Sequence, residues 1–327
     1  MASIVVNVPY GGLFMPPAIL KRLPLKPEEL GWEHFRLADP CLLNVLARAC
    51  EPATLEGRLG TKALPRRTLV SYAFSPLVAD PLGFLAAEVA AGAGGAARKV
   101  GGPPGEGGGR GGAPEAGGGG PSPDPPPAGP AVIPVTTSGG PLFGWTEEEK
   151  AVVFRKSALP YLAEIRDRVR ERLDRDSLVL LLTVRSYAGK PWNYERERRY
   201  PRPQLNIGSL DGWRTPIGLA EFIGRTFKTF GLWPELDWPH RSAYAPPELA
   251  GSRRLFCCSA SFRRDLYMDE ATGRLSAGFE GLVRILRTVF SLLEEELEQV
   301  VKVRYRRRHP PKPPSMVIKA APRKRAT

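Results

Sequence analysis

Apolar runs alternate with amphipathic segments along most of the chain. The run at residues 3–8 ends at Pro9, and the run at 177–184 is almost entirely aliphatic. Both are typical of buried strands, and the second is typical of a central parallel strand covered on both faces. Shorter runs of the same character predict four more strands, at residues 68–74, 131–137, 204–207 and 255–260. The pattern therefore predicts a sheet.

Helical periodicity fills the spaces between these strands. Thr146 and Glu149 form a capping-box pattern ahead of apolar residues spaced by three and four, which predicts a helix over 146–175. Pro160 should kink or divide that helix, because proline lacks the backbone donor that a helix interior needs. Three more helices are predicted, one beginning at Pro40 with Asp39 as its N-cap, one over 215–231 and one over 277–301.

Strands that alternate with helices indicate an α/β fold, a three-layer sandwich with a mixed, largely parallel central sheet. The chain has 327 residues, enough for one large domain or two smaller ones. Glycine and proline supply 25 of the 40 positions at 91–130, so this segment cannot bury a core. We interpret it as a disordered insertion within a single domain over 1–301.

The net charge of +13 is concentrated at the C-terminus. Ten Lys or Arg residues lie from Lys302 onward, which leaves 37 basic against 34 acidic residues in the rest of the chain. Residues 302–327 are predicted to be a disordered basic tail. Such a tail can bind nucleic acid or an anionic surface, or can remain simply solvated.

Composition otherwise indicates an ordinary globular protein. Hydrophobic residues make up 42% and charged residues 25% of the chain, and no apolar run has the length needed to span a bilayer. No secretory leader is expected. The four cysteines show no metal-binding spacing, and we interpret them as reduced thiols of a cytoplasmic protein; they are Cys41, Cys50, Cys257 and Cys258. The sequence does not specify an organelle or the nucleus.

Two predicted strands end in residues able to form a site. Tyr10-Gly11-Gly12 follows the first strand, and Arg185 follows the aliphatic strand. Ligands of open α/β sheets bind beyond the carboxyl ends of the strands, so a site is expected there. The alternative is an ordinary turn that contains a half-buried tyrosine.

Six segments, in order along the chain, resemble the N-formylglutamate amidohydrolase (formylglutamate deformylase) family. RDLYMDE at 264–270 resembles the family's NRxLYMDE, and VVNVPYGGLFMPP at 5–17 resembles its strand–PHGG–PP opening. The other four are SPLVADPLGF, IPVTTSGGPLF, LLTVRSYAGKPW and RPQLNIGSLDGWRTP. The resemblance implies a zinc-carboxypeptidase-like (phosphorylase/hydrolase-like) fold and, in the family, metal-assisted amide hydrolysis.

The resemblance also shows where this chain departs from the family. The positions of the family's metal-binding and acidic residues hold Tyr10, Thr183, Arg185, Gln204, Arg214 and Ser261. A guanidinium stays charged in a protein and repels a nearby divalent cation, so we expect no bound metal. The residues that match the family are expected to line the pocket; they are Gly11, Gly12, Asp39, Asp80, Arg264, Tyr267, Asp269 and Glu270.

Two hypotheses follow. In the first, the chain is a non-catalytic relative whose basic pocket binds a small anion such as a carboxylate or phosphate, with no cofactor. Tyr10, Arg185, Arg214 and Arg264 would line that pocket. In the second, it is an active hydrolase of N-formyl or N-acyl amino acids with a divergent zinc shell, rebuilt for example from His34 and Asp39, and Arg264 clamps the substrate carboxylate.

Overall fold

The computed structural model describes residues 2–51, 67–82, 146–192, 199–210, 212 and 215–305. The predicted insertion at 91–130, the strand at 131–137, Arg214 and most of the basic tail lie outside the described residues. Those predictions, and the cytoplasmic location, therefore stay predictions.

Six strands form one mixed sheet in the order β2-β1-β3-β6-β4-β5. The strands are β1 Ala2–Val8, β2 Arg67–Ser71, β3 Leu178–Tyr187, β4 Leu205–Gly208, β5 Pro234–Leu236 and β6 Leu255–Arg263. Neighbouring pairs among β2, β1, β3 and β6 are parallel, whereas β4 runs antiparallel to β6 and carries β5 parallel to itself. The predicted mixed, largely parallel sheet is confirmed.

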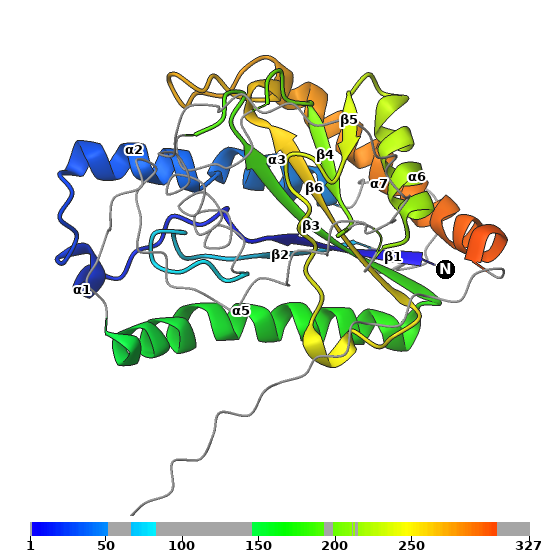
Figure 1. The fold of residues 1–327 in the computed structure, drawn as a ribbon, viewed down its shortest axis with the longest axis horizontal. Helices are drawn as coiled ribbons and strands as arrows, with labels where there is room; N and C mark the ends of the chain where they lie inside the picture. The colour runs from blue at the N-terminus through cyan, green and yellow to red at the C-terminus, as the bar shows by residue number, and fades with distance from the viewer. Residues whose placement is uncertain are drawn as a thin grey trace, which may run out of the picture.

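Helices cover both faces of this sheet (Figure 1). The helices are α1 Pro17–Leu20, α2 Pro27–Leu37, α3 Pro40–Cys50, α5 Glu147–Arg175, α6 Ile217–Lys228 and α7 Gly278–Tyr305, with short 3-10 turns η1 Pro247–Leu249 and η2 Arg264–Leu266. The larger apolar cluster joins one face of the sheet to α3, α6 and α7, and a second cluster joins the opposite face to α5. The result is the expected three-layer sandwich.

Strand periodicity explains how one sheet builds two cores. Successive side chains of a strand point to opposite faces. Cys257 accordingly lies in the cluster on the α5 side and Cys258 in the cluster on the α3–α7 side. All four cysteines are free thiols.

Several predicted boundaries shift. The helix α5 is continuous, so Pro160 does not divide it. The strand β3 runs on through Tyr187, so Arg185 lies within the end of the strand and not after it. The helix α7 runs to Tyr305, which makes the first four residues of the predicted tail helical. The helices α1 and α2, the strand β5 and both 3-10 turns are not anticipated by the sequence pattern.

No helix among the described residues combines the length and the apolar character that a bilayer crossing requires.

Candidate functional site

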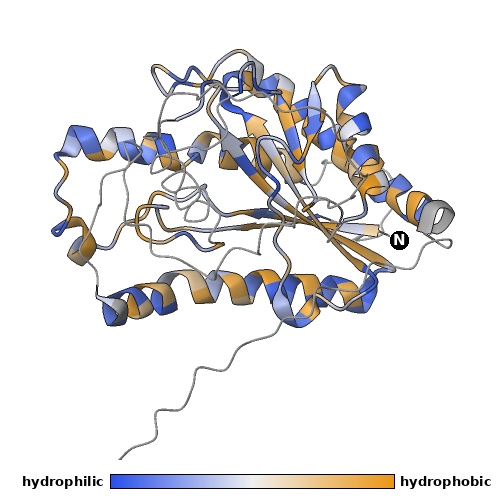
Figure 2. Cartoon of the chain, viewed as in Figure 1, coloured by the Kyte–Doolittle hydropathy of each residue, from blue (hydrophilic) through white to orange (hydrophobic). Residues whose placement is uncertain are grey.

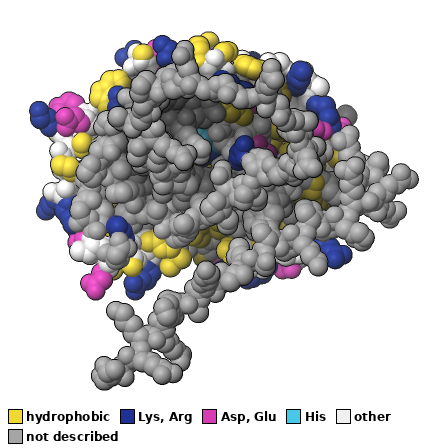
Figure 3. Space-filling view, viewed as in Figure 1, with side chains coloured by type: hydrophobic (Ala, Val, Ile, Leu, Met, Phe, Trp, Pro, Cys, Tyr) yellow, Lys and Arg dark blue, Asp and Glu magenta, His cyan; other side chains and the backbone are white. Residues whose placement is uncertain are grey.

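Four parallel strands bring their carboxyl ends to one edge of the sheet. The turn that contains Tyr10 follows β1, Asp80 lies in the loop after β2, Arg185 lies in the last residues of β3, and Ser261 lies in the last residues of β6. In an α/β sheet this edge is where ligands bind. In the space-filling view of Figure 3, a histidine and a basic side chain are visible near the middle of the face turned to the viewer.

On the α5 side, the sheet changes character along its strands. Near the start of β3 and β6 the side chains facing α5 are apolar, for example Leu181 and Cys257. Toward the carboxyl edge the residues in line with them are polar, and Figure 2 shows β3 and β6 turning from orange toward blue in this direction. We call these residues the polar half-face; they are Asn7, Thr183, Arg185, Asn206, Ser259 and Ser261.

All six residues of the polar half-face are buried. Arg185 is 3% exposed and the other five are 0% exposed. The opposite face of the same strands stays apolar, with Val184 and Ala260 in the large cluster. Buried polar groups cost free energy unless they are hydrogen-bonded, so such a patch on one half of one face indicates a site.

The strand register aligns these side chains in two rows. In the inner row Asn7 pairs with Thr183, and its Nδ2 donates to Thr183 Oγ1 at 3.1 Å. Tyr161 of α5 donates from its hydroxyl to Asn7 Oδ1. In the outer row Arg185 pairs with Ser261, and Arg185 Nε donates to Ser261 Oγ at 3.2 Å.

Tyr10 contacts Asp80 on the same side of the sheet. The Tyr10 hydroxyl donates to Asp80 Oδ1 at 3.0 Å, and the Leu82 N–H reaches the same oxygen at 3.3 Å. Tyr10 belongs to the α5-side cluster together with Tyr72 and Tyr161. The position that would carry a histidine in the resembling family therefore carries a phenol bonded to a buried carboxylate.

The turn beside Tyr10 depends on its glycines. A Cβ added to Gly12 would lie 2.2 Å from the backbone carbon and oxygen of Ala73, and one added to Gly11 would lie 2.9 Å from Leu43 Cβ. The close approach of the β1 turn to the chain after β2 therefore requires glycine at position 12. The two glycines shape the turn and offer no side chain to a ligand.

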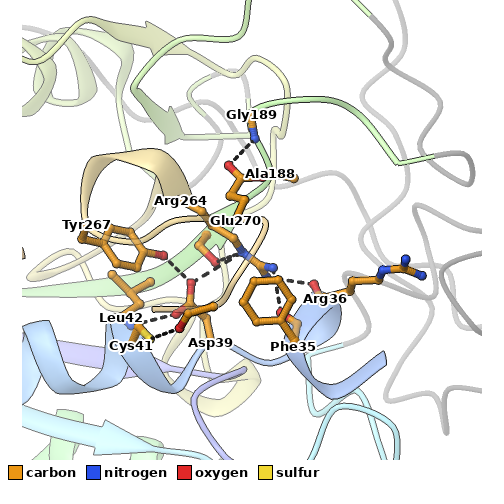
Figure 4. Close-up of polar contacts among 12 residues, drawn as sticks. Phe35, Arg36, Asp39, Cys41, Leu42, Ala188, Gly189, Arg264, Tyr267 and Glu270 are labelled. Carbon is orange, nitrogen blue, oxygen red and sulfur yellow. Dashed lines mark hydrogen bonds and ion pairs between the residues drawn. The ribbon is translucent and has the colours of Figure 1, made fainter. Parts of the chain in front are cut away.

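A second buried polar cluster lies on the opposite side of the sheet (Figure 4). Asp39 caps α3 by accepting from the Leu42 N–H at 2.7 Å, as predicted, and also accepts from the Tyr267 hydroxyl. Arg264 lies 3.6 Å from the same carboxylate and donates to Ser186 Oγ at 3.0 Å. We call these four residues, Asp39, Ser186, Arg264 and Tyr267, the Asp39 cluster.

Arg264 is directed into the protein. Its two terminal nitrogens donate to the carbonyl oxygens of Phe35 and Arg36, at 2.9 and 2.8 Å, which ties down the end of α2 (Figure 4). Ser186 and Arg185 are adjacent in a strand, so their side chains point to opposite faces. The expected single pocket lined by Arg185 and Arg264 is therefore not what the structure forms.

A different arginine accompanies Arg185. Arg202 is 0% exposed, donates to the Ala188 carbonyl at 3.2 Å, and lies 5.5 Å from the centre of the Tyr187 ring. Burial raises the pKa of the Tyr187 phenol, while the charges of Arg202, Arg263 and Arg185 oppose that rise. Two buried guanidinium groups thus flank the phenol at the end of β3.

The acidic end of the RDLYMDE segment makes local contacts. Glu270 accepts from the Gly189 N–H at 2.8 Å, and burial raises its pKa. Asp269 accepts from the Ala271 N–H and from the Thr272 hydroxyl, at 2.8 and 2.9 Å, and these hydrogen bonds lower its pKa. Both carboxylates organise the loop between β6 and α7.

The residues of this edge do not fit a zinc ion. Within the described residues, no three His, Cys, Asp or Glu side chains are grouped so that they could hold a metal. Asp39 and Asp80 already accept hydrogen bonds inside the protein. Burial lowers the pKa of His34, and His240 packs edge-on against Tyr187 at 5.6 Å. A shell rebuilt from His34 and Asp39 does not form.

Sequence reasoning missed Asn7, Asn206, Ser259 and Arg202. Ser259 carried a usable signal, because polar residues two positions apart in β3 (Thr183 and Arg185) and in β6 (Ser259 and Ser261) mark one face of a sheet. Asn206 becomes part of the row only through the antiparallel pairing of β4 with β6. Arg202 lies in a loop, and no pattern in the sequence predicts its burial.

The fold and this edge define an α/β protein with its candidate site at the carboxyl end of a mixed sheet. The crystal structure of N-formylglutamate amidohydrolase from Ralstonia eutropha JMP134 has the same fold, with a TM-score of 0.60, 19% identity, and coverage of 90% of this chain and 94% of that one. A gene product of Agrobacterium tumefaciens matches with a TM-score of 0.53, 16% identity and coverage of 89% and 92%. No family model and no curated protein sequence matches this chain.

Proposed function

We propose that this chain is a non-catalytic relative of the N-formylglutamate amidohydrolases that binds a small anion at its carboxyl edge without a metal. The observation that carries the proposal is the buried Arg185 guanidinium at the end of β3, where the resembling family has a histidine. Arg185 Nε donates to the hydroxyl of Ser261. A fixed positive charge at this point attracts an anion and repels a metal cation.

Arg202 supports the same proposal. It adds a second buried guanidinium beside Tyr187. Guanidinium groups recognise carboxylate and phosphate through paired donors, and burial strengthens that recognition because the local dielectric is low. The ligand class we propose is therefore a small carboxylate or phosphate.

The proposal is tested on the purified full chain. We expect substoichiometric zinc by elemental mass spectrometry and no hydrolysis of N-formylglutamate, with or without added zinc. Calorimetric titration with glutamate, N-formylglutamate and phosphate should detect binding of at least one anion. Arg185→Gln should weaken that binding by about 10-fold to 100-fold, the value of a hydrogen bond to a charged group.

Arg253→Gln is the matched control, because Arg253 is exposed and lies just before β6, at the opposite end from the site. It should leave the affinity unchanged. One tightly held zinc per chain together with turnover of N-formylglutamate would reject the proposal and establish the alternative, an active metal-dependent hydrolase of N-formyl or N-acyl amino acids.

A further inference from the structure

The outer row of the polar half-face extends beyond Arg185. Arg185 pairs with Ser261 across β3 and β6, and Ser261 pairs with Asn206 across β6 and β4. Directly paired residues share a face, and adjacent strands are about 4.8 Å apart, so the three side chains form a line about 10 Å long. Its two ends differ in chemistry: a cation at one end and an amide at the other.

The hydrogen-bonding capacity of Ser261 and Asn206 in this row is only partly used. Ser261 Oγ accepts from Arg185 Nε, which leaves the hydroxyl proton of Ser261 able to donate. Asn206 Nδ2 makes one long contact, 3.5 Å, to the Glu235 carbonyl. Asn206 Oδ1 is buried and accepts no hydrogen bond from any described residue. Ser259 Oγ, one step deeper on the same face, is likewise buried without a partner among the described residues.

Unsatisfied buried polar atoms are uncommon in folded proteins, and each one calls for an explanation. Here both atoms lie on the polar half-face: Asn206 Oδ1 continues the line from Arg185, and Ser259 Oγ lies in the inner row. An apolar side chain of similar shape at position 206 would remove the free-energy cost of burying an unpaired amide oxygen. The presence of an amide at position 206 is explained if a ligand supplies the missing donor.

We propose that Arg185, Ser261 and Asn206 form a subsite for a carboxylic acid that also carries a hydrogen-bond donor, a hydroxyl or an amide N–H. The carboxylate accepts from the Arg185 guanidinium and the Ser261 hydroxyl. The donor lies about 5 Å further along the row, one strand spacing away, and donates to Asn206 Oδ1. The proposal rests on the proposed function for the position of the anion and adds the selectivity of the site.

The test uses pairs of ligands that differ only in the donor. N-acetylglycine and levulinate differ by exchange of N–H for CH₂, and 4-hydroxybutyrate and pentanoate by exchange of O–H for CH₃. By calorimetric titration of the full chain, we expect the donor-bearing member of at least one pair to bind about 10-fold or more tightly, because the other member leaves Asn206 Oδ1 unpaired.

Asn206→Leu should abolish this preference. The affinity for levulinate or pentanoate should stay the same or rise, while the ratio within each pair falls to about one. Arg185→Gln should weaken both members of a pair equally, which distinguishes loss of the anion site from loss of selectivity. The ligand-free Asn206→Leu protein should unfold at an equal or higher temperature than the wild type, because the substitution removes an unpaired buried atom.

Four results would overturn the inference. Equal binding of both members of each pair by the wild type contradicts it and leaves the proposed function standing. Stronger binding of inorganic phosphate than of any of the four acids, retained in Asn206→Leu, assigns the site to a simple anion. Absence of binding by all five probes rejects both proposals, and a lower unfolding temperature for Asn206→Leu assigns Asn206 a purely structural role.

Discussion

The hydroxyl of Tyr10 donates to the carboxylate of Asp80 at 3.0 Å, and both side chains are buried. The two residues are 70 positions apart in sequence, so the bond ties the turn after β1 to the loop after β2. It joins the two connections that flank one side of the candidate site.

Tyr10→Phe should destabilise the protein by about 1–3 kcal/mol, because it removes a donor from a buried carboxylate. Urea denaturation monitored by circular dichroism measures the loss. Tyr200→Phe is the control, since Tyr200 is 66% exposed and its variant should unfold like the wild type. Equal stability of Tyr10→Phe and wild type would show that the Tyr10–Asp80 bond contributes nothing to the fold.

Gly12→Ala should reduce the free energy of unfolding by about 2–3 kcal/mol or more. The new Cβ meets backbone atoms of Ala73 at 2.2 Å, and the backbone cannot move aside as a flexible side chain can. Gly31→Ala is the matched control, because Gly31 lies in α2 with no atom within 4 Å of the added Cβ. It should stabilise the protein by about 0.5–1 kcal/mol through helix propensity. Thermal unfolding of the two variants should therefore shift in opposite directions.

Arg264→Met should cost about 3–5 kcal/mol, as expected when one partner of a buried ion pair is removed. The substitution deprives Asp39 of its cation and the end of α2 of two donors. Arg168→Met provides the control, since the Arg168–Glu171 pair on α5 is largely solvated and should contribute little. If Arg264 instead clamps a ligand, its replacement should abolish anion binding while leaving stability nearly unchanged.

Glu270→Gln should change how stability depends on pH. Burial raises the Glu270 pKa above its ordinary value of 4.5, so the folded state holds this proton more tightly than the unfolded state. The contribution is therefore fully present below pH 4.5 and is lost as pH rises through the folded pKa. Relative to Glu270→Gln, the wild type should lose stability over that window. Urea midpoints between pH 4 and 7.5 measure it, and parallel curves would contradict the assignment.

Sequence patterns predict well those elements whose start or end is set by residues within the element itself. The capping box of Thr146 and Glu149 and the N-cap at Asp39 both form as predicted. The strand β5, with three half-buried residues, has no such local signal, because only its pairing with β4 makes it a strand. Pro160 fails to divide α5, since tertiary packing of the long helix outweighs the lost hydrogen bond.

The sequence places the candidate site at the carboxyl edge of the sheet, but it does not show which side chains the strands bring together there. Strand ends locate the edge because parallel strands finish together. Which side of the sheet a residue faces there depends on register and loop path, and these separated Arg264 from Arg185. The same pairings brought Asn206 into line with Ser261, a relationship between segments 55 residues apart that no local pattern encodes.

The contrast between the two faces of β3 and β6 has a consequence for how this chain can change. The fold is stabilised mainly by the larger apolar cluster, in which one face of the sheet packs against α3, α6 and α7. Substitutions among the hydroxyl, amide and guanidinium groups of the polar half-face do not alter the packing of that cluster. The chemistry at the carboxyl edge can therefore change through many residue types while the fold itself persists.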